Sequence, residues 1–470
     1  MSEQRNFNLG DLLKPEKLIQ LGLSSPLGAV AATSVIDRPT LWAIVELYLP
    51  LSRLWAAASA ANGCPEAFAE QVPIHGMSAS MRSHAEGLLQ TFEKARSDAV
   101  RADTEWEAAF FGPANVARNA LVLAEQRRIE RAQALVIQRI RFSYMLMRKS
   151  VPPVRFDLAS EADVEAAYGN IQSNPEQSFL PPERLPDVEV SRRIPSPAGQ
   201  DYWIRFRSPS DRVGGTAWAR VHEPLDVSDP PTFIFGNGIG VEFDQIRYVM
   251  DDVVDLCRRG VRVIEIEAPW HGRRIEPGHY SGEPFLARAP IGAMDLFSAQ
   301  VKEMAVIIDW CRRTSTGRVG VGGASMGALA AQLAGTHSRN WPERLRPDVL
   351  GLITFCDRVH ELPFKSALAH KTGLSNAIRK AGWTPESCQR WRGLTDAIED
   401  PAVKPENIIA VLGTEDEITP FEIGKRQVER WGVPESNLFI RRQGHFSVPV
   451  GLVRDNRPIR RIAELLCEGG

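Results

Sequence analysis

The sequence has almost no net charge and no strongly basic segment. Its 56 Lys and Arg residues nearly balance 58 Asp and Glu residues, which leaves a formal charge of −2 at pH 7. Stretches rich in Arg, such as EQRRIERAQ, also carry acidic residues. Proteins that bind nucleic acids present a concentrated basic surface to the phosphates, so we expect no nucleic-acid partner.

Cysteine is scarce, since only six of the 470 residues are cysteines and no two of them stand in a CxxC pair. Zinc sites and dense disulfide frameworks need closely spaced cysteines, so neither is expected. His75 and His84 also lack the spacing of metal ligands on a helix. We therefore expect mostly buried free thiols and no metal ion.

No long uninterrupted apolar segment is present. The stretch LWAIVELYLPLSRLWAAASAA at 41–61 has the length of a membrane span but contains Glu46, Pro50 and Arg53. We interpret it as a pair of packed helices broken near Pro50 and expect no integral membrane segment; an interfacial membrane helix is the alternative. The N-terminus lacks the basic start and apolar core of a signal peptide, which predicts a cytoplasmic location.

The chain changes character near residue 185. Residues 1–150 space apolar residues three and four apart, which predicts an N-terminal helical domain, and the Pro-rich segment 151–186 is interpreted as a connector with one short helix. Over 187–470 short β-rich runs appear, and from TFIFG onward helical stretches separate them. This alternation predicts an α/β fold, in which an antiparallel meander precedes a mostly parallel sheet with helices on both faces.

One serine stands where a strand-like run meets a helix-like run. In GVGGASMGALAAQLAG (320–335) the apolar run ends in glycines, and Ser325 precedes an Ala/Leu-rich helix. Gly323, Ser325 and Gly327 form a GxSxG string, in which the serine occupies a strained strand-to-helix turn. Such a turn leaves no room for side chains at the two glycine positions. A helix N-cap is the alternative role for Ser325.

A serine hydroxyl needs a base, and the base needs an orienting acid, before the serine can act as a nucleophile. Asp416 follows the apolar run NIIAVLG, and His445 follows the run LFIRR. Because each of the three residues comes after a predicted strand, we expect them to meet at the carboxyl edge of the sheet. Asp357, after LITFC, is an alternative acid, and a loop histidine without a catalytic role is the alternative for His445.

Residues 187–470 resemble the serine hydrolases of the α/β-hydrolase superfamily. The serine elbow, the acid loop and the histidine loop follow in the superfamily's order. The strings PWHGRR, GASMG and GHFS are also similar to a poorly characterised branch with PxxGxR, GxSMG and GHxS motifs, whereas the N-terminal helical part is not matched. The resemblance implies that Ser325 is the nucleophile, His445 the base and Asp416 the acid of a catalytic triad.

The resemblance also implies an oxyanion hole built from two backbone N–H groups. One belongs to Met326, directly after the nucleophile. Alignment of Asn237 and Gly238 with the superfamily's His-Gly pair assigns the other to Ile239. Because Asn stands where His is common, Gly238 or Gly240 is the alternative donor.

Two loops near the nucleophile are expected to contact the substrate. Asn237 and Gly238 lie in the oxyanion loop, and His271 in PWHGRR is expected at the mouth of the site. Arg273 and Arg274 hold a substrate carboxylate or phosphate in one interpretation, and form loop salt bridges in the other.

Two further segments are expected to shape the site. Residues at about 357–403 lie between two predicted strands, where this fold often inserts a helical cap, and Trp383 in this segment is expected to line an apolar substrate pocket. Packing within the cap is the alternative role for its aromatic residues. The N-terminal helical domain is expected either to cover the mouth or to form a homodimer interface.

The resemblance implies a small-molecule substrate and a serine hydrolase of the esterase type, with no metal or organic cofactor. The expected reaction is cleavage of a carboxylic ester, or of a related amide, carbamate or thioester, through an acyl-enzyme. The alternatives are a C–C bond hydrolase with the same triad, a membrane-associated lipase, and a non-catalytic protein of this fold that binds a partner.

Overall fold

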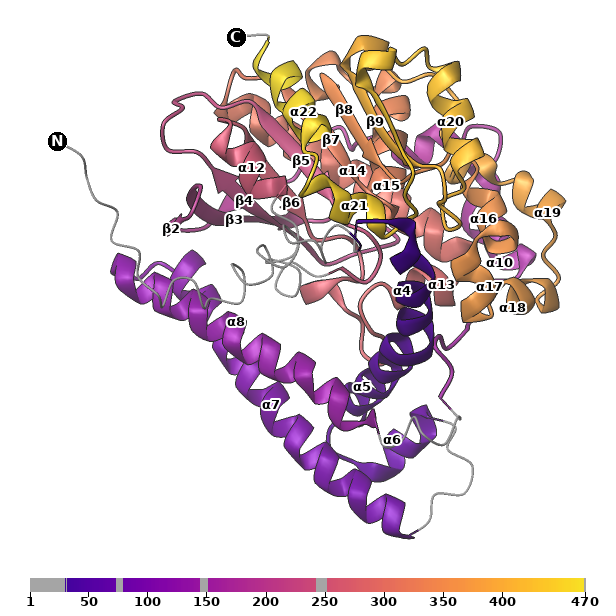
Figure 1. Cartoon of the computed structure of the whole chain (residues 1–470). Coiled ribbons are helices and arrows are strands. Elements are labelled where there is room, and N and C mark those ends of the chain that lie inside the picture. Colours follow the sequence, from indigo (N-terminus) through magenta and orange to yellow (C-terminus); the bar gives the residue numbers. More distant parts are fainter. Residues whose placement is uncertain (1–29, 31, 73–78, 144–150, 242–251, 469–470) are drawn as a thin grey trace.

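The computed structural model describes residues 30, 32–72, 79–143, 151–241 and 252–468, and its centre is a ten-stranded sheet (Figure 1). The strand order is β1-β3-β4-β6-β5-β7-β8-β9-β10, and β2 pairs with β3. Strands β5 to β10 pair in parallel, whereas β1 to β4 pair antiparallel and β4 joins β6 antiparallel. The strands are β1 (Glu189–Val190), β2 (Ile194–Ser196), β3 (Gly199–Arg207), β4 (Thr216–Glu223), β5 (Thr232–Gly236), β6 (Arg262–Ile266), β7 (Val319–Ala324), β8 (Val349–Ile353), β9 (Ile408–Gly413) and β10 (Leu438–Arg441).

Helices cover both faces of the parallel strands, which confirms the predicted fold class. Alternate residues of a strand point to opposite faces, and the two resulting apolar layers are separate in the structure. One layer packs on α14 (Ile291–Thr314), α15 (Met326–His337) and α20 (Phe421–Arg430). The other packs on α12 (Asp252–Arg258), α21 (Ser447–Leu452) and α22 (Arg457–Cys467).

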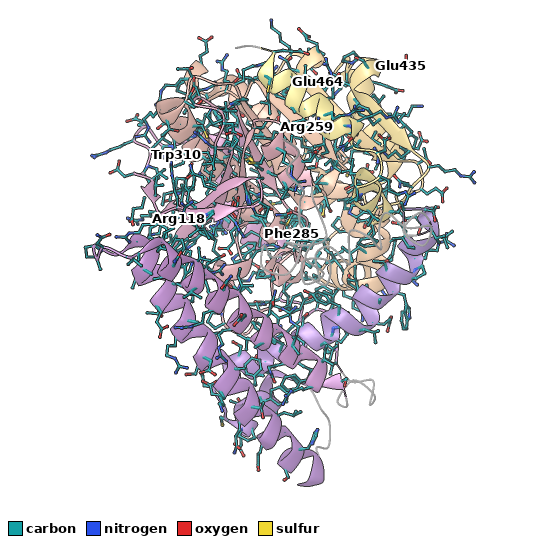
Figure 2. The ribbon with its side chains drawn as sticks, turned by 60° about the vertical axis from the view of Figure 1, so that its left-hand side comes forward. Arg118, Arg259, Phe285, Trp310, Glu435 and Glu464 are labelled. Atoms are coloured by element: carbon teal, nitrogen blue, oxygen red, sulfur yellow. The ribbon has the colours of Figure 1, made fainter. Side chains whose placement is uncertain are left out.

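The N-terminal helices form a separate layer below the sheet (Figure 1). They are α4 (Asp37–Ala43), α5 (Leu49–Ala61), α6 (Pro65–Gln71), α7 (Ala79–Phe111) and α8 (Arg118–Arg141). Helices α7 and α8 pair as a long hairpin, and Arg118 marks its end beside the sheet (Figure 2). At that end Trp106 and Phe110 of α7 pack on Trp203 of β3 and Trp218 of β4, so aromatic contacts attach the hairpin to the antiparallel strands.

The apolar stretch at 41–61 does not break into two packed helices, so that prediction was wrong. Instead α4 continues through a π-helical turn (Ile44–Tyr48) into α5, and Pro50 is at the start of α5. The N–H of Leu49 donates to the carbonyl of Ile44, which widens the helix just before the proline. Proline clashes with the carbonyl four residues earlier in a regular α-helix, and the π turn contains Glu46, the residue that carries this carbonyl for Pro50.

The charge of Arg53 in the same stretch is explained by a buried ion pair. Its guanidinium donates to Glu283 Oε2 at 2.5 Å and to the carbonyl of Gly278 at 2.5 Å. Glu283 begins α13 (Glu283–Ala287), so this pair joins the N-terminal helices to the segment that precedes α14.

Across the described part of the chain, every helix is too short or too polar to cross a bilayer.

Two further segments contain short helices: the Pro-rich connector before the sheet and the insertion between β8 and β9. The Pro-rich segment holds one short α-helix, α10 (Glu161–Tyr168), which begins with a capping box between Ser160 and Asp163. Between β8 and β9 lie α16 (Leu362–Lys365), α17 (Ala367–Thr372), α18 (Leu374–Lys380) and α19 (Pro385–Gln389), and we call residues 357–403 the cap segment. The cap segment lies over the carboxyl edge of the parallel strands (Figure 1).

Candidate active site

Ser325, His445 and Asp416 form one hydrogen-bonded chain at the carboxyl edge of the sheet. Ser325 follows β7, Asp416 follows β9 and His445 follows β10. The hydroxyl of Ser325 donates to His445 Nε2 at 2.9 Å, and His445 Nδ1 donates to Asp416 Oδ2 at 2.8 Å. The structure therefore brings together the three side chains that the sequence selected.

Asp416 is held by its own loop. Its Oδ1 accepts hydrogen bonds from the N–H groups of Ile418 and Thr419, both at 2.8 Å, and its Oδ2 accepts from the Thr419 hydroxyl at 2.8 Å. The carboxylate is buried, with 6% of the residue exposed, and these bonds fix its orientation toward His445. The alternative acid, Asp357, makes no hydrogen bond to His445 in the described residues.

Ser325 occupies a strained backbone conformation, with φ 53° and ψ −122°. A Cβ on Gly323 would lie 2.4 Å from the carbonyl oxygen of Gly236, and a Cβ on Gly327 would lie 2.0 Å from the same atom. Both glycines are therefore required because α15 and β7 pass so close to the end of β5. An N-cap role does not account for this geometry, since the Ser325 side chain makes no cap hydrogen bond.

The loop after β5 lies beside the serine. A Cβ on Gly238 would approach Ser325 Cβ to 3.5 Å, and Ile239 lines the same pocket as Ser325. The N–H of Gly240 donates to His271 Nε2 at 3.0 Å, so this N–H is already used. Of the two alternative oxyanion donors, Gly238 and Gly240, Gly240 is therefore disfavoured because its N–H already bonds to His271.

His271 is not available to bind substrate through its ring nitrogens. Its Nδ1 donates to the carbonyl of Pro269 at 2.9 Å while its Nε2 accepts from Gly240, and only 2% of the residue is exposed. Burial lowers the pKa of His271 to about 4, so the ring is neutral near pH 7. Asn237 and Gly238, in the loop after β5, lie with His271 around a small cavity.

Comparison with known proteins identifies the fold. Residues 241–349 match the family model described as alpha/beta hydrolase domain containing 18. The chain has the α/β-hydrolase fold. No curated protein sequence matches the chain.

Solved structures with a similar arrangement are distant in sequence. An acetyl xylan esterase from Paenibacillus sp. R4 is 14% identical with a TM-score of 0.43, and the match covers 65% of this chain and 96% of that one. An S-formylglutathione hydrolase from Agrobacterium tumefaciens is 14% identical with a TM-score of 0.40, over 59% and 99% of the two chains. A 2,6-dihydroxy-pseudo-oxynicotine hydrolase is 15% identical with a TM-score of 0.40, over 84% and 94%.

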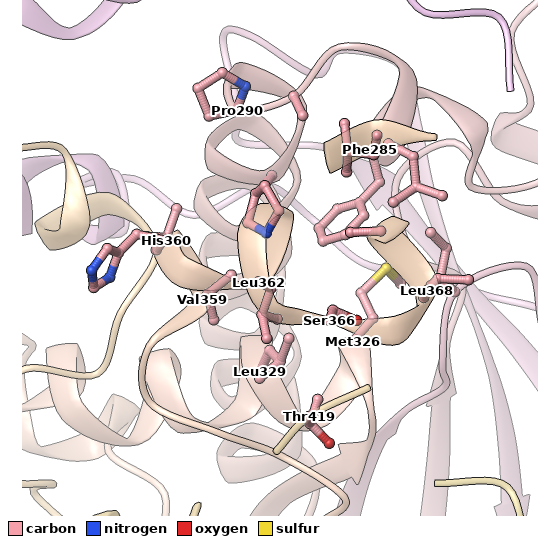
Figure 3. A pocket seen from close by; sticks show the side chains of 18 of the residues that line it. Phe285, Pro290, Met326, Leu329, Val359, His360, Leu362, Ser366, Leu368 and Thr419 are labelled. Carbon is pink, nitrogen blue, oxygen red and sulfur yellow. The ribbon is translucent and has the colours of Figure 1, made fainter. Parts of the chain in front are cut away.

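An apolar pocket opens beside Ser325 in this α/β-hydrolase fold (Figure 3). Its volume is about 100 Å³, and it lies between α13, α14 and α15 on one side and the cap segment on the other. Its larger side chains include Phe285, Met294, Met326, Leu329, Leu362 and Leu374. None of the described residues that line it is Asp, Glu, Lys or Arg, so the pocket favours an uncharged, apolar group.

Trp383 is placed away from this pocket, contrary to the expectation from the sequence. It is buried, and its Nε1 donates to the carbonyl of Ala159 in the connector at 2.7 Å. A buried indole N–H needs an acceptor, and here the connector supplies it. Trp383 therefore attaches the cap segment to the connector. His360 contributes to the pocket wall, and both its N–H and its Nδ1 bond to the buried carboxylate of Asp396.

The two arginines of the PWHGRR loop form salt bridges. Arg274 makes a bidentate pair with Glu303 of α14, with N–O distances of 2.8 and 2.7 Å. Arg273 pairs with Asp103 of α7 and packs over the rings of Trp106 and Trp218. Their charges are therefore neutralised by the fold, in agreement with the salt-bridge interpretation.

Thr419 is a site residue that the sequence analysis did not identify. It bonds to Asp416 through its N–H and its hydroxyl, and the hydroxyl also lies 3.3 Å from His445 Nδ1. The string DEIT carried a usable signal, since Asp often bonds to backbone N–H groups two and three residues later in the chain.

No cluster of His, Cys, Asp and Glu with the geometry of a metal site occurs in the described residues.

Proposed function

We propose that this protein is a serine hydrolase that cleaves esters of small, uncharged carboxylic acids. The observation that carries the proposal is the continuous chain from the Ser325 hydroxyl through His445 to the buried carboxylate of Asp416. The apolar pocket beside Ser325 supports an acyl group without charge.

In the first half-reaction Ser325 Oγ attacks the ester carbonyl carbon while its proton moves to His445 Nε2. Asp416 orients the imidazole and stabilises the imidazolium that forms. When the tetrahedral intermediate collapses, the C–O bond to the alcohol breaks and His445 gives its proton to the leaving oxygen. The product of this step is an acyl-Ser325 ester and a free alcohol.

In the second half-reaction His445 takes a proton from water, and the resulting hydroxide attacks the acyl-Ser325 carbonyl. Collapse of the second intermediate returns the proton to Ser325 Oγ and releases the carboxylic acid. In both intermediates the N–H groups of Met326 and Ile239 stabilise the negative oxygen. The choice of Ile239 is supported by two facts: Gly240 already donates to His271, and Ile239 lines the pocket beside Ser325, whereas Gly238 does not.

The test compares wild type with Ser325→Ala on p-nitrophenyl esters and on aryl amides. Loss of Ser325 should lower kcat by about 10⁴-fold or more. Intact-mass analysis should show one fluorophosphonate adduct on wild type and none on the variant. Ser338→Ala, at the other end of α15, changes a buried serine whose hydroxyl bonds, among the described residues, only to the Gly335 carbonyl, and it should keep both adduct and turnover.

Two other outcomes of this experiment would contradict the proposal. An adduct without turnover of any ester would exclude the ester substrate and direct the search to C–C bonds, which the same triad can cleave. If wild type forms no adduct and turns over no ester or amide, the proposed nucleophile is wrong.

A further inference from the structure

The first residue of α4 contacts the loop that holds His445, although the two lie at opposite ends of the chain. Asp37 Oδ1 accepts a hydrogen bond from the N–H of Phe446 at 2.6 Å and from the N–H of Ser447 at 3.3 Å. Its Oδ2 accepts from the Ser447 hydroxyl at 2.5 Å. Figure 1 shows the indigo α4 beside the yellow α21 that begins at Ser447.

These bonds satisfy groups that the histidine loop cannot satisfy by itself. The first N–H groups of a helix have no partner within it and are usually bonded by a nearby Ser, Thr, Asp or Asn. Phe446, the residue before α21, supplies no such side chain. Asp37 performs this role from a distant part of the sequence, and a carboxylate suits the partial positive charge of a helix start.

The carboxylate also restrains the loop on the other side of His445. A Cβ on Gly444 would lie 2.5 Å from Cγ of Asp37, so the backbone of Gly444 packs directly against the carboxyl group. The N–H of Gly444 donates to the Ser447 hydroxyl at 2.8 Å, and that hydroxyl donates to Asp37. His445 therefore lies between two residues whose backbones are both held through Asp37.

The same helix reaches the acid loop. Leu41 and Val45 pack with Ile418, whose N–H donates to Asp416 Oδ1. Arg38 pairs with Glu417 at 3.0 Å, but both side chains are largely exposed and such a pair contributes little. The contacts shielded from solvent are thus the part-buried hydrogen bonds of Asp37 and the buried apolar contacts of Leu41, Val45 and Ile418.

We propose that Asp37 is a positioning residue, which holds the loop 444–447 so that His445 Nε2 stays within hydrogen-bond reach of Ser325. The inference rests on the proposed hydrolase function. It assigns the N-terminal helices a role in catalysis, since they complete the support of the catalytic histidine. A small displacement of a general base lowers the rate of the chemical step more than it lowers substrate binding.

The test uses Asp37→Ala, Asp37→Asn and, as a neighbouring control, Arg38→Ala in the full-length protein. Asp37→Ala should lower kcat on p-nitrophenyl esters by about 10- to 100-fold and change KM less than 3-fold. The rate of fluorophosphonate labelling should fall by a similar factor. Asp37→Asn should recover most of the loss, because its amide oxygen accepts from Phe446 and Ser447 and its amide N–H donates to the Ser447 hydroxyl. Arg38→Ala should stay within about 2-fold of wild type.

A second measurement separates this inference from the proposed function. Amide hydrogen exchange of the peptide containing Phe446 and Ser447 should be faster in Asp37→Ala than in wild type, and nearly unchanged in Asp37→Asn. This result does not depend on turnover, so it holds even if no ester is cleaved. Unchanged exchange in Asp37→Ala overturns the inference, and so does an unchanged kcat in an active enzyme. Equal losses of kcat in the Ala and Asn variants, together with a large fall in Tm, also overturn it, since they indicate general destabilisation.

Discussion

The N–H of Gly240 donates to His271 Nε2 at 3.0 Å, and His271 Nδ1 donates to the carbonyl of Pro269 at 2.9 Å. One imidazole thus connects the loop after β6 to the loop after β5, which carries the proposed oxyanion donor. A Cβ on Gly282 would lie 2.6 Å from His271 Nε2 and 2.9 Å from Ile239 Cγ1, so the ring and the donor residue both pack against the same glycine. The hydrogen bond from Gly240 to His271 therefore holds the loop after β5, with Ile239 in it, in one conformation.

His271→Phe should impair catalysis more than His271→Gln. Phenylalanine fills the space but offers neither an acceptor to Gly240 nor a donor to Pro269, whereas the glutamine amide offers both. We expect kcat to fall about 10- to 100-fold for Phe and only a few-fold for Gln, because misplaced oxyanion donors lose part of their contribution. The measurement is kcat and KM, together with the affinity for a trifluoromethyl ketone, which mimics the tetrahedral intermediate. An equal affinity of wild type and His271→Phe for the ketone would contradict the prediction.

The pocket should select acyl groups by size and charge. An apolar cavity of about 150 Å³ holds a benzene molecule, so the cavity of about 100 Å³ beside Ser325 has room for about four carbon atoms. Among p-nitrophenyl esters, kcat/KM should be highest from propionate to valerate and fall at least 10-fold by decanoate. Leu329→Ala should move the optimum to longer chains, because Leu329 forms part of the wall. Leu452→Ala, a buried change on the other face of the sheet, is the control and should leave the optimum in place. A flat profile up to decanoate would show that this cavity does not hold the acyl chain.

A charged acyl group should be rejected. The mono-p-nitrophenyl ester of succinate differs from the butyrate ester mainly by a carboxylate, and none of the described residues of the lining is Lys or Arg, while His360 already bonds to the carboxylate of Asp396. Burial of an unpaired carboxylate is costly, so kcat/KM should be at least 100-fold lower for succinate than for butyrate. Comparable rates for the two esters would place the acyl group outside the pocket.

The ion pairs of His222 should make stability depend on alkaline pH. His222 is largely shielded from solvent, which opposes its charge, but its ring nitrogens each lie 2.9 Å from a carboxylate oxygen, one of Asp201 and one of Glu265. The carboxylates prevail over the burial and over the nearby Arg220, and the pKa of His222 is raised to about 9, against about 6.5 for the unfolded chain.

Since the folded state holds this proton more tightly, the stabilisation is complete below pH ~6.5 and is lost as pH rises through about 9. The free energy of unfolding of wild type relative to His222→Gln should therefore fall by about 3 kcal/mol between pH 6 and pH 10. Urea unfolding at several pH values measures this difference. A difference that does not change over this range would show that His222 is not charged in the folded protein.

Gly327→Ala should destabilise the fold strongly, and Gly335→Ala on the same helix should destabilise it much less. A Cβ at 327 would lie 2.0 Å from the carbonyl oxygen and 2.2 Å from the carbonyl carbon of Gly236, and backbone atoms at the end of β5 cannot move aside cheaply. At 335 the nearest atom is the end of the Leu350 side chain at 3.0 Å, which can rotate. We expect a loss of about 3 kcal/mol or more in the free energy of unfolding at 327, and less than about 1.5 kcal/mol at 335. Chemical denaturation of the two variants gives the comparison.

Local patterns were sufficient for the fold class and for the three residues of the proposed triad. Each of Ser325, Asp416 and His445 comes within four residues of the end of a strand, and parallel strands bring their carboxyl ends to one edge of the sheet. The glycines around Ser325 could likewise be interpreted from sequence, because the strained turn imposes its steric requirement within five residues.

Contacts between distant parts of the chain were beyond such patterns. The sequence around Trp383 does not show that its indole bonds to Ala159, and that around His271 does not show that both ring nitrogens are used by backbone groups. The hydrogen bond from the N–H of Phe446 to Asp37 is the clearest case, since no sequence pattern near either residue predicts this contact. Hydrophobic periodicity and turn residues act over a few positions and so determined the elements and their order. Only tertiary packing, which brings together groups hundreds of residues apart, decided which polar atoms pair and hence which side chains remain free to act.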